Sequence, residues 1–282
     1  MKNILIFGSG SYIGEAVAKW LLKKENEYAV KVMPSIGVSV EATDFSLYHV
    51  IYYVAGIAHQ KETKENAHLY YEVNRDLACS VAKKAKKDGV GQFILMSTLS
   101  VYGMNVGVIQ KDTKEQPVTH YGKSKMQADR RIQKLADNNF HVTILRPPMV
   151  YGAGCKGNYQ RLRSLALKTP VFPAIKNQRS MIYIDNLCAY IERVIREDIT
   201  GIRIPQNRDY VCTTEMVRLI AKEHGRKILF IKIPSILIQM APVSTIKKVF
   251  GSLICDSRED RENTVADFAT TIHLAEKRGK TV

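Results

Sequence analysis

The stretch Asn3-Ile4-Leu5-Ile6-Phe7-Gly8-Ser9-Gly10-Ser11-Tyr12-Ile13-Gly14, near the start of the chain, decides the fold class. Residues 3–7 form a short apolar run that ends at a glycine, a pattern typical of a buried parallel strand. The segment Tyr12–Lys24 that follows has the apolar spacing of a helix. Glycines at such a junction let the backbone approach a pyrophosphate, whose charge the helix N-terminus attracts. We therefore predict a dinucleotide-binding loop formed by Gly8, Ser9, Gly10, Ser11, Tyr12, Ile13 and Gly14.

Strands and helices alternate through the first half of the chain, which implies a parallel sheet with right-handed crossovers. The pattern predicts strands at Tyr28–Met33, Val50–Val54, Gln92–Ser97 and His141–Arg146, and helices at Glu65–Asp88 and His120–Asn138. We expect an α/β protein whose residues 1–152 form a Rossmann-type, doubly wound parallel sheet. Residues 153–282 should form a smaller C-terminal substrate-binding lobe, with some segments returning to the sheet. Its expected elements are helices at Tyr159–Leu167, Asn186–Arg196 and Thr214–His224, and strands at Met181–Ile184 and Ile228–Ile233.

Composition narrows the classes of protein and partner. The 282 residues carry a formal net charge of +15, which favours an anionic partner. The cations are spread along the chain and no nucleic-acid-binding motif is present, so we expect no nucleic acid partner. Five cysteines without a CxxC pair fit reduced thiols in a cytoplasmic protein and no metal site. The later apolar stretch Ile233–Val243 is too short to span a bilayer, so no membrane insertion is expected.

A tyrosine and a lysine four residues apart open the helix expected at His120–Asn138. Tyr121 and Lys125 share one helix face, about one turn apart. A tyrosine with a pKa of about 10 is a poor acid–base catalyst at neutral pH, but a neighbouring ammonium stabilises its phenolate. Thr98 follows the strand at Gln92–Ser97, at the sheet edge where ligands bind. We predict Thr98, Tyr121 and Lys125 as the catalytic set, with Thr98 hydrogen-bonded to the oxygen whose proton Tyr121 moves and Lys125 also to the nicotinamide ribose.

Together these motifs resemble the extended short-chain dehydrogenase/reductases of the nucleotide-sugar epimerase/dehydratase family. The glycine loop matches a GxxGxxG pattern, except that Ser11 stands where the middle glycine is expected. The resemblance implies further cofactor contacts from Val54, Ala55 and Gly56, from Asn74, and from Pro147 and Val150. It also implies a homodimer through Glu65–Asp88 and His120–Asn138. The stretch between Pro34 and Val50 is short for the family, and Asp44 is its candidate to reach the adenine.

The second half of the chain resembles the sugar-nucleotide-binding part of UDP-glucose 4-epimerase-like enzymes. The resemblance implies that Asn158 and Arg179 contact the diphosphate of a UDP-sugar, a role that suits the bidentate, permanently charged guanidinium. Other segments look most like a bacterial subgroup that includes reductases of UDP-4-keto-6-deoxy-N-acetylhexosamines. We therefore expect an enzyme that acts at C4 of a UDP-sugar in the synthesis of surface-polysaccharide precursors.

Three alternatives stay open at this point. A 4-ketoreductase is favoured over a UDP-glucose/UDP-galactose 4-epimerase, because the shortened segment after Pro34 suggests a loosely held, exchangeable cofactor. The cofactor is NAD or NADP: no acidic or basic residue follows the strand at Tyr28–Met33, and NADPH is slightly favoured for a reductase. A non-catalytic dinucleotide sensor or nucleic-acid-binding relative is the remoter possibility, and the intact Tyr121, Lys125 and Thr98 set argues against it.

Overall fold

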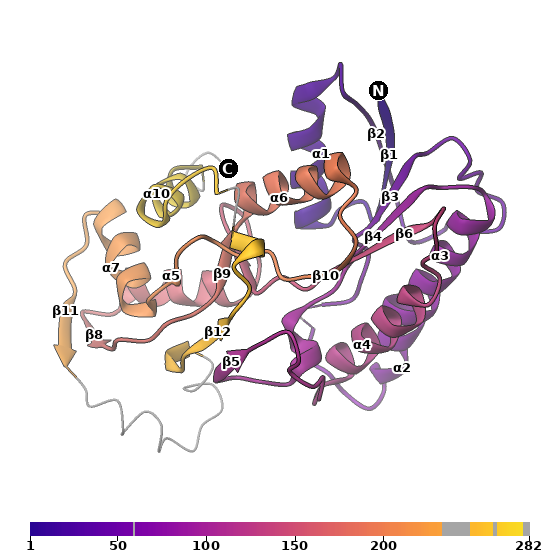
Figure 1. Cartoon of the computed structure of the whole chain (residues 1–282). Coiled ribbons are helices and arrows are strands. Elements are labelled where there is room, and N and C mark those ends of the chain that lie inside the picture. Colours follow the sequence, from indigo (N-terminus) through magenta and orange to yellow (C-terminus); the bar gives the residue numbers. More distant parts are fainter. Residues whose placement is uncertain (59, 233–248, 262–263, 279–282) are drawn as a thin grey trace. The chain divides into compact units, whose positions relative to one another are not determined.

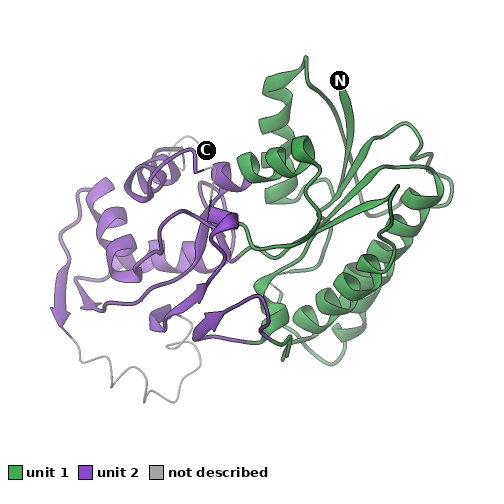
Figure 2. Ribbon diagram, viewed as in Figure 1, with its two compact units in different colours: residues 1–103, 114–147, 188–205 green, residues 104–113, 148–187, 206–282 purple. Residues whose placement is uncertain are grey.

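The computed structural model describes residues 1–58, 60–232, 249–261 and 264–278, which form two compact units (Figure 2). Unit 1 comprises residues 1–103, 114–147 and 188–205, and unit 2 comprises residues 104–113, 148–187 and 206–282. The stretch Ile233–Val243 and the end of the strand expected at Ile228–Ile233 lie outside the described residues. No helix among the described residues has the length and apolar character needed to cross a bilayer.

Unit 1 is built on a six-stranded, fully parallel sheet. Its order is β10 (Gly201–Arg203), β6 (His141–Leu145), β4 (Gln92–Met96), β3 (Val50–Tyr53), β1 (Lys2–Phe7) and β2 (Tyr28–Met33). Strands β3 and β4 are buried along their whole length, as expected for a sheet with helices on both faces. The predicted α/β Rossmann-type sheet is confirmed.

The register aligns the carboxyl ends of the central strands. Phe7 lies opposite Tyr53, Tyr53 opposite Leu95, and Met96 opposite Leu145. The chain moves from β1 to β2 on one side and then to β3 on the other, so the strand order reverses at β1. In open parallel sheets the crevice at such a reversal is where ligands bind.

Helices cover both faces of this sheet (Figure 1). One face carries α2 (Ala67–Tyr71), α3 (Ala78–Lys87) and α4 (His120–Gln133), and the other carries α1 (Tyr12–Leu21), with its 3₁₀ extension η1 (Leu22–Lys24), and the part of α6 (Ile184–Glu197) from Cys188 onward. Phe7, Tyr53 and Phe93 stack across β1, β3 and β4 in the core under α3.

Two predicted helices differ in detail from the structure. The helix expected at Glu65–Asp88 is interrupted by a π-helical turn, η2 (Glu72–Leu77), between α2 and α3. Helix α4 ends at Gln133 rather than Asn138, because Asp137 accepts hydrogen bonds from the backbone N–H groups of Asn139 and Phe140 and turns the chain toward β6. Periodicity alone does not reveal either change.

The described residues of unit 2 form helices and three parallel strand pairs. The pairs are β7 (Met149–Tyr151) with β9 (Met181–Tyr183), β8 (Val171–Ala174) with β11 (Leu229–Lys232), and β5 (Gly107–Ile109) with β12 (Leu253–Cys255). The helices are α5 (Asn158–Lys168), the first residues of α6, α7 (Thr213–Glu223), the 3₁₀ turn η4 (Glu259–Arg261) and α10 (Phe268–Arg278).

One buried carboxylate ties three helices of unit 2 together. Glu276 of α10 is 1% exposed and accepts hydrogen bonds from the Tyr159 hydroxyl (2.7 Å) and from Arg163 Nε (2.7 Å) of α5. His224, at the end of α7, lies 2.6 Å from the same carboxylate. Since a buried carboxylate requires such partners, Glu276 fixes the packing of these helices.

Candidate active site

Thr98, Tyr121 and Lys125 come together in unit 1. Thr98 directly follows β4 and caps the 3₁₀ turn η3 (Leu99–Tyr102) by accepting a hydrogen bond from Ser100 N (3.2 Å). Tyr121 and Lys125 lie one turn apart at the start of α4. Thr98 lies close enough to Tyr121 for its side chain to favour the phenolate and lower the pKa of Tyr121. The arrangement places a hydroxyl, a phenol and an ammonium at the carboxyl edge of the sheet.

The environment of the two ionisable groups disfavours the charged form of each. Burial raises the pKa of Tyr121, and the Thr98 hydrogen bond counteracts this by favouring the phenolate. Burial lowers the pKa of Lys125 to about 8, against the pull of Asp129. The ammonium is 3% exposed and donates a hydrogen bond to the carbonyl oxygen of Met96 (2.8 Å). Ionisable groups shifted in this way are typical of acid–base sites.

A carboxylate that the sequence analysis did not single out holds the start of α4. Glu62 accepts hydrogen bonds from the backbone N–H groups of His120 and Tyr121, both at 2.9 Å. Thr119 supplies the N-cap by accepting from Gly122 N at 3.0 Å. These contacts fix the backbone that carries Tyr121, and they anchor the segment after β3 to the same helix end. A glutamate in a polar loop gives no local signal of this role.

The glycine loop between β1 and α1 has a fixed backbone. Gly8 N and Ser9 N both donate to the carbonyl oxygen of Met33, at 2.8 and 3.0 Å. Ser11, at the position of the missing glycine, is the N-cap of α1 and bonds Gly14 N (3.2 Å). Gly10 has a φ of +74°, which favours glycine, and its N–H donates to the Glu15 carboxylate (3.2 Å).

The segment after β3 runs beside this loop. Val54 N and Ala55 N donate to the carbonyl oxygen of Phe7, both at 3.0 Å. A Cβ at Gly8 would lie 2.6 Å from Ala55 N, so a side chain there would collide with the backbone. Asn74, in the π-helical turn, is fully buried and bonds both Ile57 and Ser124. Asn74 therefore holds in place the segment after β3 that is predicted to contact the cofactor.

These features fit a dinucleotide. The turn from β1 into α1 carries two glycines, so a pyrophosphate could approach its backbone and the positive end of the helix. A Cβ at Gly56 would lie 2.8 Å from Asn74 Oδ1 and 3.2 Å from Lys125 Nζ, so a side chain there would collide with both groups. Asp44 is exposed and accepts from Ser46 N (2.9 Å) in the loop after β2. Pro147 follows β6 in unit 1, whereas Val150 lies on β7 in unit 2.

The two predicted substrate residues belong to unit 2. Arg179 is partly buried, and its Nη1 donates to the carbonyl oxygen of Gly251 (2.8 Å). In the part of the chain that the structure describes, no carboxylate pairs with it, and burial lowers its pKa. A partly buried guanidinium without an anionic partner is suited to bind an anion. Asn158 is the first residue of α5, directly after Gly157.

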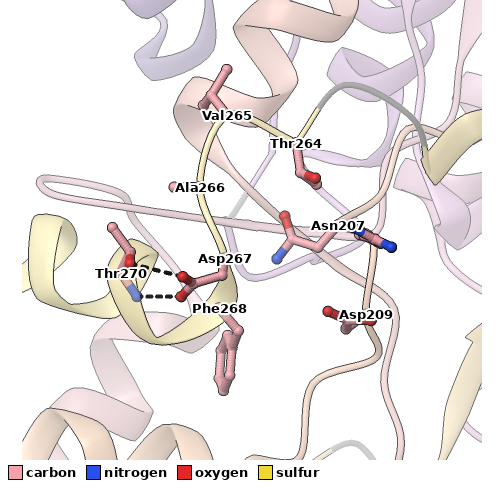
Figure 3. A pocket seen from close by; sticks show the side chains of 9 residues that line it. Asn207, Asp209, Thr264, Val265, Ala266, Asp267, Phe268 and Thr270 are labelled. Carbon is pink, nitrogen blue, oxygen red and sulfur yellow. Dashed lines mark hydrogen bonds between the residues drawn. The ribbon is translucent and has the colours of Figure 1, made fainter.

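A pocket of about 440 Å³ in unit 2 contains none of the predicted site residues (Figure 3). The amide of Asn207 is engaged by Tyr183 N, Asn186 and Tyr151. The Asp267 carboxylate caps α10 through Thr270. Because these polar groups already form hydrogen bonds that stabilise the fold, we assign no catalytic or binding role to the pocket. The residues that line it are Asn207, Arg208, Asp209, Thr264, Val265, Ala266, Asp267, Phe268 and Thr270.

Comparison with known families gives the deciding observation. Residues 4–211 match the NAD dependent epimerase/dehydratase family. The chain belongs to this family. The expected class of enzyme is thereby confirmed: an NAD(P)-dependent protein of the short-chain dehydrogenase/reductase type, with NAD or NADP as the class of cofactor. No group of residues suited to hold a metal ion occurs in the described ranges.

Two curated members of the epimerase/dehydratase family are similar over most of the chain. A UDP-glucose 4-epimerase from Vibrio cholerae is 31% identical over 78% of this chain and 75% of its own length. An N-acetyl-alpha-D-glucosaminyl-diphospho-ditrans,octacis-undecaprenol 4-epimerase from Escherichia coli O157:H7 is 27% identical over 72% of this chain and 66% of its own length. Both are named as sugar 4-epimerases.

Solved structures of the epimerase/dehydratase family share the fold. The UDP-glucuronic acid 4-epimerase from Bacillus cereus, solved with NAD, has a TM-score of 0.76 and 19% identity. The match covers 99% of this chain and 98% of that chain. At this level of identity, the similarity establishes the fold alone. The reaction is inferred from the side chains of the site.

Proposed function

We propose that this protein is a 4-epimerase of a hexose carried on a diphosphate, with a UDP-hexose as the first candidate substrate. The observation that carries the proposal is the grouping of Thr98, Tyr121 and Lys125 after β4 and at the start of α4. The names of the two curated relatives favour epimerisation over the reduction that the sequence analysis preferred.

The proposed chemistry begins with a proton transfer. The Tyr121 phenolate takes the proton of the sugar 4-hydroxyl, and Thr98 orients that oxygen by hydrogen bonding. Lys125 stabilises the phenolate through its positive charge. A bound NAD⁺ would supply the two-electron chemistry by accepting the C4 hydride and later returning it to the opposite face of the sugar. Tyr121 then returns the proton to the new hydroxyl, so no cofactor is consumed.

We propose that residues 1–152 hold the dinucleotide. The loop Gly8–Gly14 would bind its pyrophosphate, Val54, Ala55 and Gly56 would lie along it, and Lys125 would bond the nicotinamide ribose. Asn74 would keep this segment in place, with Asp44, Pro147 and Val150 as the remaining candidate contacts. Because the second strand ends without an acidic or basic residue, the backbone rather than one charged side chain would set the choice between NAD and NADP.

We propose that residues 153–282 hold the substrate, with Arg179 and Asn158 on its diphosphate. The partly buried guanidinium of Arg179 supports this role because the described residues offer it only a carbonyl oxygen. One relative is named for a sugar on a polyprenyl diphosphate rather than on a nucleotide. Arg179 would serve either carrier equally, since both present the same diphosphate.

A 4-ketoreductase is the second candidate, and the glycine loop favours it. The N–H of Gly10 is engaged by the Glu15 carboxylate, so a negative charge lies where an anionic cofactor would bind. A weakly held dinucleotide suits an enzyme that exchanges it at each turnover, whereas an epimerase must retain it until the hydride returns. The same proton transfer by Tyr121 would then protonate the oxygen of a 4-keto sugar.

One set of incubations tests these candidates. The protein is supplied with NAD⁺ and UDP-glucose, UDP-galactose, their N-acetyl forms, or polyprenyl-diphospho-N-acetylglucosamine, and products are separated by chromatography. Interconversion of gluco and galacto sugars without a net change in the absorbance of reduced nicotinamide is the expected result. Stoichiometric oxidation of NADPH or NADH with UDP-4-keto-6-deoxy-N-acetylglucosamine would contradict the epimerase proposal and support the reductase. Salt-dependent binding of random DNA or RNA without any turnover would replace both by a binding protein.

We further propose a homodimer formed through the α2–α3 segment and α4. Light scattering should give the mass of two chains at micromolar concentration. A single-chain mass at that concentration would contradict the proposal.

A further inference from the structure

A fully buried carboxylate lies one turn beyond Lys125 on helix α4. Asp129 is 0% exposed, and its Oδ2 accepts hydrogen bonds from Ser97 Oγ (2.9 Å) and Arg146 Nε (2.9 Å). Ser97 follows β4, next to Thr98, and Arg146 follows β6. The carboxylate is therefore fixed by the carboxyl ends of two strands that frame the catalytic set.

A second layer of contacts holds Arg146 in turn. This guanidinium is 1% exposed, donates to the Tyr102 hydroxyl (3.0 Å) and pairs with Glu115. Glu115 also accepts from Arg130 at 2.9 Å. A network of buried, charged side chains with this many hydrogen-bond partners is rigid. The position of the Asp129 charge is thus set by the fold.

The other oxygen of Asp129 is the unusual feature. Within the described residues, Oδ1 is buried and accepts no hydrogen bond. Lys125 lies four residues earlier on the same helix face, and the charge of Asp129 acts on it although no hydrogen bond joins the two. The same charge reaches Tyr121, on which Tyr70 of α2 also acts. Asp129 is therefore a negative charge that acts on Lys125 and is hydrogen-bonded to Arg146.

We propose that Asp129 is a positioning residue for the reaction: its buried carboxylate, fixed by Ser97 and Arg146 one turn beyond Lys125 on α4, is the counter-charge of the Lys125 ammonium beside Tyr121. The inference rests on the proposed use of Tyr121 and Lys125 and adds a residue that contacts neither substrate nor cofactor. A purely structural role would not need a charge here, because a neutral, well-packed group in place of a buried ion pair is often no less stable. Burial disfavours the protonated form of Lys125, and the negative charge of Asp129 offsets this effect.

The sign of the effect follows from the charges. Asp129 raises the pKa of Lys125 and also that of Tyr121, so its neutralisation lowers both. Tyr121 must lose a proton for activity and Lys125 must keep one. Both limbs of a bell-shaped pH–activity profile should therefore move to lower pH when Asp129 is neutralised.

The test compares Asp129→Asn with Ser97→Ala, which removes a hydrogen bond to the same oxygen but leaves the charge. In Asp129→Asn, both limbs of the kcat/KM profile should move to lower pH by roughly one pH unit. In Ser97→Ala the profile should stay in place, whatever happens to the rate. A reduced rate with unmoved limbs in Asp129→Asn would overturn the proposal and leave Asp129 a structural residue.

A second measurement needs no turnover, so it separates this proposal from the proposed function. The ultraviolet absorbance of the Tyr121 phenolate, taken as the difference between each protein and its Tyr121→Phe counterpart, should appear at lower pH in the Asp129→Asn background. An unchanged titration overturns the inference even if the enzyme is active. A shifted titration supports it even if no sugar is turned over. If Asp129→Asn fails to fold, ¹³C NMR can follow the titration of the Asp129 carboxyl in the wild type and in Lys125→Met. The carboxyl should titrate at higher pH in Lys125→Met, and equal titration in the two proteins would overturn the proposal.

Discussion

The side chain of Asn74 takes up both backbone polar groups of Ile57. Its Oδ1 accepts from Ile57 N (2.8 Å), and its Nδ2 donates to Ile57 O (3.1 Å). The remaining amide proton points to Ser124 Oγ (3.3 Å), between Tyr121 and Lys125 on α4. One amide therefore connects the predicted cofactor segment after β3 to the helix that carries the proposed acid–base pair.

Asn74→Ala should weaken dinucleotide binding by about tenfold, because the loss of one buried partner costs about 1–3 kcal/mol. Calorimetric titration with NAD⁺ and NADP⁺ measures the change. Asn66→Ala is the matched control, since Asn66 holds the outer part of the same loop through Lys61 O and Thr63 N. Equal losses in the two variants would mean that Asn74 has no special link to the cofactor.

Tyr121→Phe should lower turnover by about 10²–10⁴-fold and leave dinucleotide binding intact, because only the ionisable hydroxyl is removed. Lys125→Met should reduce both turnover and binding. Steady-state kinetics and cofactor titration separate the two outcomes. A Tyr121→Phe enzyme with the wild-type rate would sink the assignment of Tyr121.

The rate should stop rising with pH above about 8, where the buried Lys125 loses its proton. Burial raises the pKa of Tyr121 above its usual value, so the phenolate fraction alone would continue to grow with pH beyond that point. Lys125→Arg keeps a permanent positive charge, so its rate should be lower overall but should continue to rise above about pH 8. The profile of kcat/KM between neutral and alkaline pH shows the difference. A plateau above about pH 8 in Lys125→Arg would assign the plateau to another group.

Glu15→Gln should raise the affinity for the dinucleotide several-fold, since it removes a negative charge from the glycine loop at Gly10 N. The gain should shrink at high ionic strength, because salt screens exposed charges. Glu25→Gln, an exposed acid just after η1, is the matched control and should change little. Identical affinities for wild type and Glu15→Gln would show that the carboxylate moves aside without cost.

Glu276→Ala should destabilise unit 2 by about 3–5 kcal/mol, because it leaves buried partners on α5 and α7 without their carboxylate. Burial alone would raise the pKa of Glu276, but hydrogen bonds from Tyr159, His224 and Arg163 hold it below its usual value. The stability from this contact is therefore present at neutral pH and is lost as the pH falls through the acid range. Thermal melting should show a smaller acid dependence in Glu276→Gln than in the wild type.

Local patterns were sufficient to predict β1, the glycine loop and α1, because each residue there follows from its neighbours in the chain. The same holds for the spacing of Tyr121 and Lys125. Four strands have only three residues each and form only because they pair with another strand, so the sequence periodicity does not predict them: β5, β7, β10 and β12. Asp129 was missed for a similar reason: its role depends on Ser97 and Arg146, which come from two other strand ends.

The π-helical turn at Glu72–Leu77 changes how the surrounding helix would tolerate length variation. A π turn holds one residue more than an α turn, so it resembles a single-residue insertion that the helix has absorbed. Removal of one residue there would restore a regular helix and leave α2 and α3 close to their present orientation, whereas a deletion inside α3 would rotate the residues on its two sides by about 100° relative to each other. The effect of a deletion in the turn would fall on Asn74, which would lose the position from which it bonds Ile57. A single-residue deletion in this turn should therefore preserve the helix but disturb the segment that is predicted to contact the cofactor, and it should be better tolerated by the fold than a deletion inside α3.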